Sequence, residues 1–248
     1  MRTQRALLTL TLMLSFAAVA CADGMLIPGP PDRPIPDVPN FTVKYHHVDV
    51  TIKDQVATTH IDQVFINEAN REVEATYLFP LPHGSVVRDF SVVADGKRMD
   101  VTLMDKEEAI GIYEEIMRKR RDPALFHYVG NDTYQARIYP IPSKGERQIE
   151  ITYSELLGFD ADVVEYVYPM STEQFSSEPV KETVFNCKIT SKDPIASVYC
   201  PTHNVDVDKP DQTHATVSYE ENDTRPDRDL RLYYTVSTDE VGTHLMTY

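Results

Sequence analysis

The sequence contains no tryptophan and is poor in glycine, cysteine and cationic residues. Its 248 residues include 9 Gly and 3 Cys, and 24 Lys plus Arg stand against 39 Asp plus Glu, a formal net charge of −15. A chain of this charge repels nucleic-acid phosphates and anionic lipid surfaces, which excludes both as general partners. The sequence also lacks a glycine-rich phosphate loop and a Gly-x-Ser-x-Gly motif, so nucleotide-dependent and serine-hydrolase chemistry have no support.

The N-terminus has the pattern of a secretory signal. Arg2 and Arg5 form a short basic region, and the uncharged run Ala6–Ala20 ends in small residues of the type that signal peptidases cut. The run is too short for a comfortable membrane span. We therefore expect residues 1–22 to be a signal peptide and the chain to be periplasmic, displayed on the cell surface or secreted.

The three cysteines bear on anchoring and on cross-linking. Ala18-Val19-Ala20-Cys21 resembles a bacterial lipobox, so Cys21 is either lipidated, which would make the chain a lipoprotein with an N-terminal membrane anchor, or lost with a signal peptide cut after Ala22. Cys187 and Cys200 remain in both cases. Two thiols outside the cytoplasm tend to pair, and their spacing suits adjacent strands of a hairpin, so we expect a disulfide. Two separate buried thiols are the alternative.

Hydrophobic residues make up 42 % of the chain, enough for a sizeable core. Residues 23–40 are rich in proline and are expected to form a stiff, extended linker before the first strand. From Phe41 onward, alternation of apolar and polar residues predicts short strands. The expected strands are 41–52, 64–66, 73–79, 90–94, 99–103, 125–129, 134–138, 149–153, 184–189, 196–199, 215–219 and 230–236.

Two local signals refine this pattern of strands. The alternation shifts by one residue at His46-His47, which predicts a bulge, and Asp95-Gly96 predicts a hairpin turn. Many short strands separated by turn signals are typical of an antiparallel β-sandwich. A loop-like stretch at Gly158–Asp162 is expected to separate two β-rich regions.

One segment has helical rather than strand periodicity. Asp105 and Glu108 form a capping-box pattern, and apolar residues follow at helical spacing. The basic run Arg118–Arg121 suits the C-terminal end of a helix dipole, although it could also bind a sulfated glycan or be cut by a protease. We therefore expect an amphipathic helix over 105–121.

The order of these elements resembles a known family. Four stretches carry the resemblance: 62–67 (DQVFIN), 75–82 (ATYLFPLP), 106–115 (KEEAIGIYEE) and 131–147 (NDTYQARIYPIPSKGER). They are similar to the VIT domain, the module of vault proteins and inter-alpha-trypsin inhibitor heavy chains. The resemblance implies a VIT domain over residues 41–158. It also implies a smaller β-rich connector over 159–248, of the kind that precedes a von Willebrand A domain in that family.

The resemblance implies a function as well as a fold. It predicts a non-enzymatic extracytoplasmic interaction or scaffold module whose partner is a protein, in the extracellular matrix or on a cell surface, that the sequence does not name. The Asp-x-Ser-x-Ser motif of the A-domain metal site does not occur here. We predict no catalytic residue, metal ligand or cofactor. The alternatives are a free-standing secreted domain that binds carbohydrate or protein, and a periplasmic hydrolase built from scattered acids.

Three groups of residues suggest metal binding only superficially. His46 and His47 are adjacent, and adjacent strand residues point to opposite faces, so they cannot easily share an ion. Cys200 and His203 supply at most half of a zinc site. Asp206, Asp208 and Asp211 could bind calcium, but the stretch lacks the glycine and the bidentate glutamate of an EF-hand, so a solvated strand end is expected.

Overall fold

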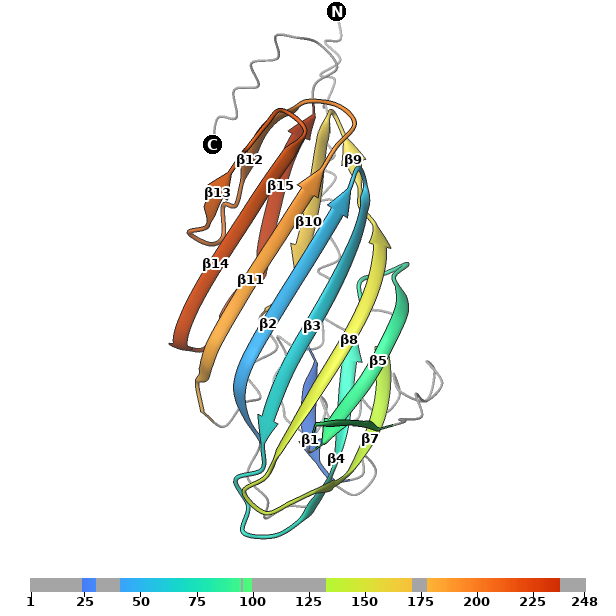
Figure 1. Cartoon of the computed structure of the whole chain (residues 1–248), viewed down its shortest axis with the longest axis vertical. Coiled ribbons are helices and arrows are strands. Elements are labelled where there is room, and N and C mark those ends of the chain that lie inside the picture. The colour runs from blue at the N-terminus through green and yellow to red at the C-terminus, as the bar shows by residue number, and fades with distance from the viewer. Residues whose placement is uncertain (1–23, 30–40, 95, 100–132, 171–177, 237–248) are drawn as a thin grey trace, which may run out of the picture.

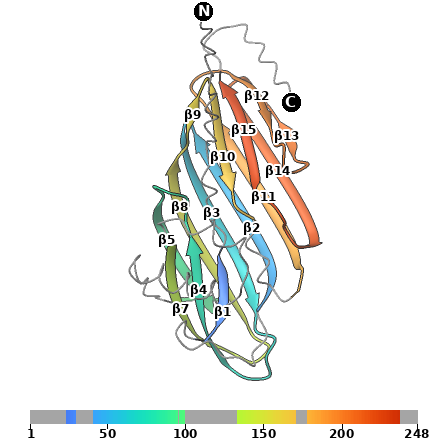
Figure 2. The same cartoon turned by 180° about the vertical axis from the view of Figure 1, so that it is seen from behind.

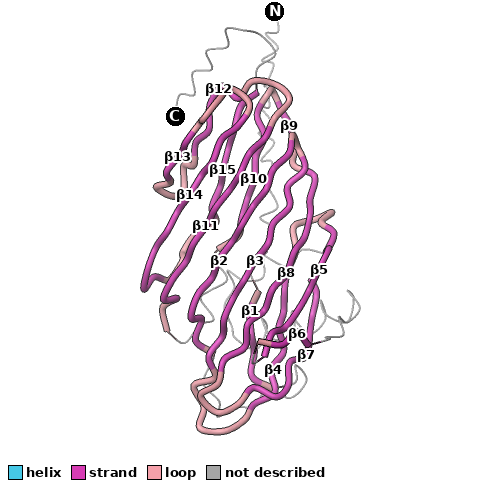
Figure 3. The backbone as a smooth tube through the Cα atoms, viewed as in Figure 1, coloured by secondary structure: helices cyan, strands magenta, loops and turns pink. Residues whose placement is uncertain are grey.

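A computed structural model of the chain describes residues 24–29, 41–94, 96–99, 133–170 and 178–236. These residues contain strands and loops and no helix (Figure 3). The expected signal peptide over 1–22, the candidate lipidation site Cys21, the helix over 105–121 and the strand over 125–129 lie outside the described residues.

The described strands form three sheets. The largest has eight strands in the order β13-β14-β11-β2-β3-β8-β5-β6, and the two smaller ones have the orders β1-β4-β7 and β12-β15-β10-β9. The bounds are β1 Met25–Pro28, β2 Thr42–Lys53, β3 Val56–Ile66, β4 Val73–Pro80, β5 Val86–Ala94, β6 Lys97–Met99, β7 Thr133–Ile141, β8 Glu146–Leu156, β9 Phe159–Asp160, β10 Val163–Tyr168, β11 Val180–Thr190, β12 Ile195–Tyr199, β13 Asp206–Asp208, β14 His214–Thr224 and β15 Leu230–Val236.

Both small sheets cover the same face of the eight-stranded sheet. Figure 1 shows the long sheet in front, and Figure 2 shows the two small sheets one above the other on its far side. The expected mainly β fold is confirmed, and the described strands form three sheets. One pair departs from the antiparallel expectation: β11 lies parallel to β2, from Thr183 opposite His46 to Thr190 opposite Lys53. Through this pairing the long sheet runs without a break from the first β-rich region into the second.

Strand β2 shows how the apolar pattern sets its orientation. Its register against β3 shifts between Val43 and Tyr45, which confirms the bulge close to where the sequence predicts it. Beyond the bulge His46, Val48 and Val50 are buried, while His47 and the residues that alternate with them face outward. The two histidines therefore lie on opposite faces, as the period of a strand requires.

The expected linker over 23–40 is wrong for its first part. Met25–Pro28 forms β1, which pairs with β4 from Met25 opposite Leu78 to Pro28 opposite Ala75. Met25, Leu26 and Ile27 are all buried, since three consecutive large apolar side chains gain more from burial than from an exposed spacer. The alternation test missed this strand because a continuous apolar run has no period of two.

The segment between the two β-rich regions contains a small hairpin. Phe159–Asp160 pairs with Val163 and Val164, and the two residues between them, Ala161 and Asp162, have φ of 47° and 65°. Positive φ at both central residues is the geometry of a type I′ turn, whose twist matches the flanking strands. The loop expected at Gly158–Asp162 is thus partly strand, and β10 directly after it is a strand that the periodicity reading did not identify.

Candidate functional site

A depression among the described residues lies where the end of β8 meets the β9–β10 hairpin. It has a volume of about 670 Å³ and is called here the end groove. Its apolar lining includes Leu156 and Phe159, which are 75 % and 46 % exposed. Large apolar side chains left open beside a groove are typical of binding surfaces. The full lining is Pro82, Glu155–Ala161, Val163, Glu165, Val167, Arg231 and Tyr233.

Glu155 is the unusual residue of the end groove. It follows Ile149, Ile151 and Tyr153 on the core-facing side of β8 and lies opposite Ala57 of β3. Its Oε1 atom is buried and has no hydrogen-bond partner among the described residues. Burial raises the pKa of this carboxyl to about 7, because the apolar surroundings disfavour its charged form. Among the described residues, the end groove therefore holds a buried acid with an unsatisfied oxygen atom.

A second carboxyl in the end groove is fully engaged. Glu165 Oε1 accepts hydrogen bonds from Arg231 Nη1 at 2.8 Å and from the Tyr233 hydroxyl at 2.7 Å. The donors come from β15 and the acceptor from β10, so the contact fixes the outer face of the small sheet. The ring of Tyr233 also stacks on Tyr199 of β12, with centroids 5.2 Å apart and an interplanar angle of 18°. This wall of the groove is therefore polar, and its side chains bind one another.

A buried chain of polar side chains joins all three sheets. Tyr77 of β4 donates its hydroxyl proton to Gln63 Oε1 at 2.9 Å, and the Gln63 amide donates to His46 Nδ1. Because Nδ1 accepts, His46 carries its proton on Nε2 and donates to the Tyr168 hydroxyl at 2.7 Å. Burial, and to a smaller extent His47, lowers the pKa of His46 to about 3. The imidazole is thus a neutral structural connector.

The two cysteines are free thiols in the structure. Cys187 is buried in β11 of the long sheet, and burial raises the pKa of its thiol. Cys200 follows β12 and lies 3.5 Å from the Thr202 hydroxyl. The disulfide between them stays a prediction. The expected hairpin is wrong, because β12 leaves the long sheet to pair with β15.

The other candidate ligands lie apart from the end groove. His203 Nδ1 is 3.0 Å from the Thr202 hydroxyl, and burial lowers its pKa, with a smaller effect from Arg228. It lines a second depression of about 400 Å³ together with Tyr219, whose ring it meets edge-on. Among the residues that the structure describes, no three His, Cys, Asp or Glu side chains are grouped to hold a metal ion.

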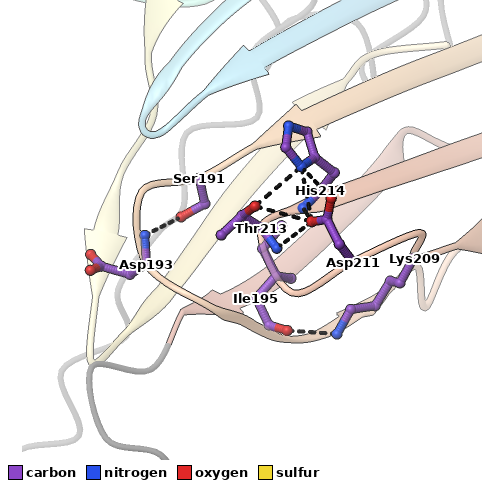
Figure 4. A network of polar contacts seen from close by, with 7 residues as sticks. All are labelled: Ser191, Asp193, Ile195, Lys209, Asp211, Thr213 and His214. Carbon is purple, nitrogen blue, oxygen red and sulfur yellow. Dashed lines mark hydrogen bonds and ion pairs between the residues drawn. The ribbon is translucent and has the colours of Figure 1, made fainter.

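The three aspartates that suggested calcium do not act together. Asp206 and Asp208 are exposed on β13, as expected for a solvated strand. Figure 4 shows Asp211 in a tight turn, where its Oδ1 accepts from the backbone amides of Thr213 at 2.7 Å and His214 at 2.9 Å. His214 Nδ1 also lies 2.9 Å from this carboxylate. These bonds, with the Asp211 side chain half exposed, make it a turn-forming residue.

The sequence reading missed the end groove entirely. Glu155 could have been noticed, because it occupies a core-facing position in the alternation of β8. Glu165 could have been placed only if β10 had been identified, and Val163–Tyr168 does alternate in burial. The convergence of β8, β10 and β15 on one groove depends on the sheet order, which no local pattern encodes.

The part of the chain that the structure describes contains no helix long and apolar enough to cross a membrane.

Comparison with known proteins places these features in a family context. Residues 43–153 match the family model described as the vault protein inter-alpha-trypsin domain. The chain is 25 % identical over 148 residues to protein mono-ADP-ribosyltransferase PARP4 of Mus musculus. The aligned region covers 58 % of this chain and 8 % of the mouse protein. It is also 25 % identical over 128 residues to inter-alpha-trypsin inhibitor heavy chain H4 of Homo sapiens. That alignment covers 51 % of this chain and 14 % of the human protein.

Two further similarities extend beyond the family model. A von Willebrand factor A domain-containing protein of Dictyostelium discoideum is 23 % identical over 173 residues, covering 67 % of this chain and 18 % of that protein. The crystal structure of a putative nutrient binding protein from Legionella pneumophila matches with a TM-score of 0.57 at 15 % identity, over 87 % of this chain and 72 % of that one. The latter shows a shared fold. These curated relatives are much longer proteins, of which the chain spans 8 to 18 %.

Proposed function

We propose that the chain, whose residues 43–153 match the family model of the VIT domain, is a non-enzymatic, extracytoplasmic interaction and scaffold module. Its role is to brace a von Willebrand A domain and to bind a protein partner. The similarity to a von Willebrand factor A domain-containing protein supports the first part of this role. The pattern of Arg2, Arg5 and the apolar run Ala6–Ala20 supports the extracytoplasmic location.

The observation that carries the scaffold role is the parallel pairing of β2 with β11. It extends from His46 opposite Thr183 to Lys53 opposite Thr190, and it makes one sheet of two β-rich regions. The buried contact between His46 and Tyr168 ties the covering sheet to the same strand. A body joined by backbone hydrogen bonds and a filled core transmits load as one unit, which suits a module that holds a neighbouring domain in place.

The bracing role is tested on the longer gene product. The gene is sequenced beyond the codon for Tyr248, and where it encodes an A domain, that domain is produced alone and joined to this chain. We expect the joined A domain to unfold at a higher temperature than the isolated one, and the separate pieces to bind each other when mixed. A stop codon directly after Tyr248, or unfolding temperatures that do not change on joining, would refute the bracing role.

The location is tested at the N-terminus of the mature protein. Mass spectrometry of the purified natural protein should find a chain that starts either with a lipid-modified Cys21 or after Ala22. An intact N-terminus that begins at Met1 in the natural host contradicts export.

One observation favours a second candidate function, a hydrolase. Glu155 has a carboxyl with a pKa near 7 in a groove that also holds the ionic contact of Glu165 with Arg231, and such a pair of acids in different environments suits acid–base chemistry. The purified chain and its Glu155→Gln variant are assayed on nitrophenyl glycosides and esters. Turnover by the wild type that the variant lacks would support the hydrolase and contradict the non-enzymatic module.

A further inference from the structure

Strand β10 has an open edge. The sheet β12-β15-β10-β9 ends at β9, and β9 pairs only with Val163 and Val164. Along Glu165–Tyr168 the described part of the chain places no strand on that side. An open edge presents unpaired backbone amide and carbonyl groups, which are a template for another strand. Figure 1 shows the short β9 beside the longer β10.

The direction of the amides along β10 follows from one hydrogen bond. The Val236 amide donates to the Asp162 carbonyl at 2.9 Å, and this pair directly continues the β10–β15 register beyond Val163 opposite Thr235. In an antiparallel pair, alternate residues bond the same neighbour. The amides and carbonyls of Val164, Tyr166 and Tyr168 therefore face β15. Those of Glu165 and Val167 face the open edge.

The open edge borders the end groove. Glu165 and Val167 line it together with Leu157 and Phe159. Side chains of an added strand would alternate between the sheet's two faces, so those on one face would meet the apolar lining of the groove. The groove thus offers both backbone hydrogen bonds and a side-chain pocket.

The charge of the groove selects the partner. Its lining includes the carboxyls of Glu155, Asp160 and Glu165 against the single guanidinium of Arg231, which already binds Glu165. The whole chain carries a net charge of −15, which attracts basic segments and repels acidic ones. Glu155 Oε1 lacks a partner among the described residues, so a cation beside it would satisfy a buried acceptor.

We propose that an extended segment of a protein partner adds as a strand beside β10, hydrogen-bonded to Glu165 and Val167, and places a lysine or arginine side chain against Glu155. This proposal rests on the proposed function and names the place and chemistry of its protein-binding site. Addition of a strand to an open sheet edge derives affinity from main-chain bonds and specificity from the side-chain pockets. The exposed Leu156 and Phe159 would cover the apolar residues of the added strand.

The test uses the whole chain and defined peptides. The probe is a fluorescein-labelled nonapeptide of alternating threonine and valine with one central lysine, compared with the same peptide carrying a central glutamate. We expect the lysine peptide to bind about ten-fold more tightly, and Glu155→Gln to remove most of this preference. We also expect hydrogen exchange at the Glu165 and Val167 amides to slow when the lysine peptide binds.

Two variants at one position separate the backbone from the side chain. Val167→Pro removes an amide that β15 does not use, and proline is tolerated on sheet edges, so the variant should fold and lose about ten-fold or more in affinity. Val167→Thr keeps the amide and should bind like the wild type. Circular dichroism and thermal unfolding of both variants confirm folding before binding is compared.

Three results would overturn the proposal. The first is that a lysine peptide with N-methylated backbone amides binds as tightly as the unmethylated lysine peptide. The second is that a folded Val167→Pro variant binds the lysine peptide as tightly as the wild type does. The third is that the lysine peptide does not bind at millimolar concentration. Each leaves the bracing role intact, because that role is measured on the A domain. Failure of the bracing experiment, with strand addition retained, refutes the scaffold function instead.

Discussion

The imidazole of His46 lies 2.7 Å from the hydroxyl of Tyr168, so one buried hydrogen bond connects β2 of the long sheet to β10 of the four-stranded sheet that covers it. Both side chains are fully buried. The same imidazole accepts from Gln63, which in turn accepts from Tyr77. The chain of hydrogen bonds from Tyr77 through Gln63 and His46 to Tyr168 thus links strands of all three sheets, and removal of its central imidazole tests how the layers hold together.

His46→Leu is expected to lower the free energy of unfolding by about 2–4 kcal/mol, because it leaves the buried Gln63 amide and Tyr168 hydroxyl without this partner. Urea unfolding at pH 7.5 or so measures the change. His47→Leu is the matched control, since His47 faces outward, pairs with the exposed Glu182 and stacks on Tyr45, whose ring a leucine can still contact; it should change stability by less than about 1 kcal/mol. Equal effects of the two substitutions would contradict the buried connector.

The lowered pKa of His46 also predicts a pH dependence. The folded imidazole stays neutral down to about pH 3, whereas the unfolded one takes up a proton near 6.5, so this residue's contribution is lost as pH falls between those values. The loss amounts to at most about 1.4 kcal/mol per pH unit. The stability difference between wild type and His46→Leu should therefore shrink as pH falls from 7 to 4 or so. A difference that stays constant over this range contradicts the assignment.

Glu155→Gln is expected to stabilise the chain at pH 8 or so by up to about 3 kcal/mol. Its folded pKa is raised from 4.5 to about 7, so the acid holds its proton when the unfolded chain has lost it, and stability falls as pH rises through this window. The gain in the free energy of unfolding should vanish below pH 4.5, where the carboxyl is protonated in both the folded and the unfolded chain. Urea unfolding at both pH values tests this, with the exposed Glu220→Gln on β14 as a control that should change little. A destabilised Glu155→Gln variant would mean that the carboxyl has a structural partner.

Gly24→Val tests whether β1 is docked as described. A Cβ at Gly24 would lie 1.8 Å from the hydroxyl oxygen of Tyr77, whose ring is buried and whose hydroxyl is bound to Gln63, so it has no room to move. Undocking β1 exposes Met25, Leu26 and Ile27, and we expect a loss of about 2–5 kcal/mol. Gly158→Val, where an added Cβ meets nothing within 4 Å, is the control and should be nearly neutral. Similar thermal unfolding of the two variants would place β1 elsewhere.

The thiols of Cys187 and Cys200 predict two reaction rates with a thiol reagent in the mature chain, where Cys21 is lipidated or lost. Cys200 is partly exposed and should react in the folded chain, whereas the buried Cys187, whose pKa is raised by burial, should react only after unfolding. Reaction with Ellman's reagent, with and without urea, measures this. Cys200→Ser should abolish the fast phase and leave the slow one. Absence of any reaction in urea without reductant would instead establish the disulfide that the sequence suggested.

The sequence by itself determined the elements whose physics is local. Alternation located β2, β4, β8, β11, β14 and β15 because each buries one face, and Gly96, with φ of 73°, occupies the turn expected between β5 and β6. It placed His46 and His47 on opposite faces for the same reason. The stretches resembling the VIT domain were identified correctly, and the family model matches residues 43–153.

Only the tertiary structure decided how these strands combine. The parallel pairing of β2 with β11, the docking of β1 on β4 and the departure of β12 to a different sheet join residues far apart in the chain. Such choices depend on which strand edges and apolar faces remain available once the others have paired, and no local period records that. The end groove follows from them: Glu155 is an ordinary acid in the sequence, and its burial against β9 and β10 makes it an unpartnered carboxyl beside an open strand edge.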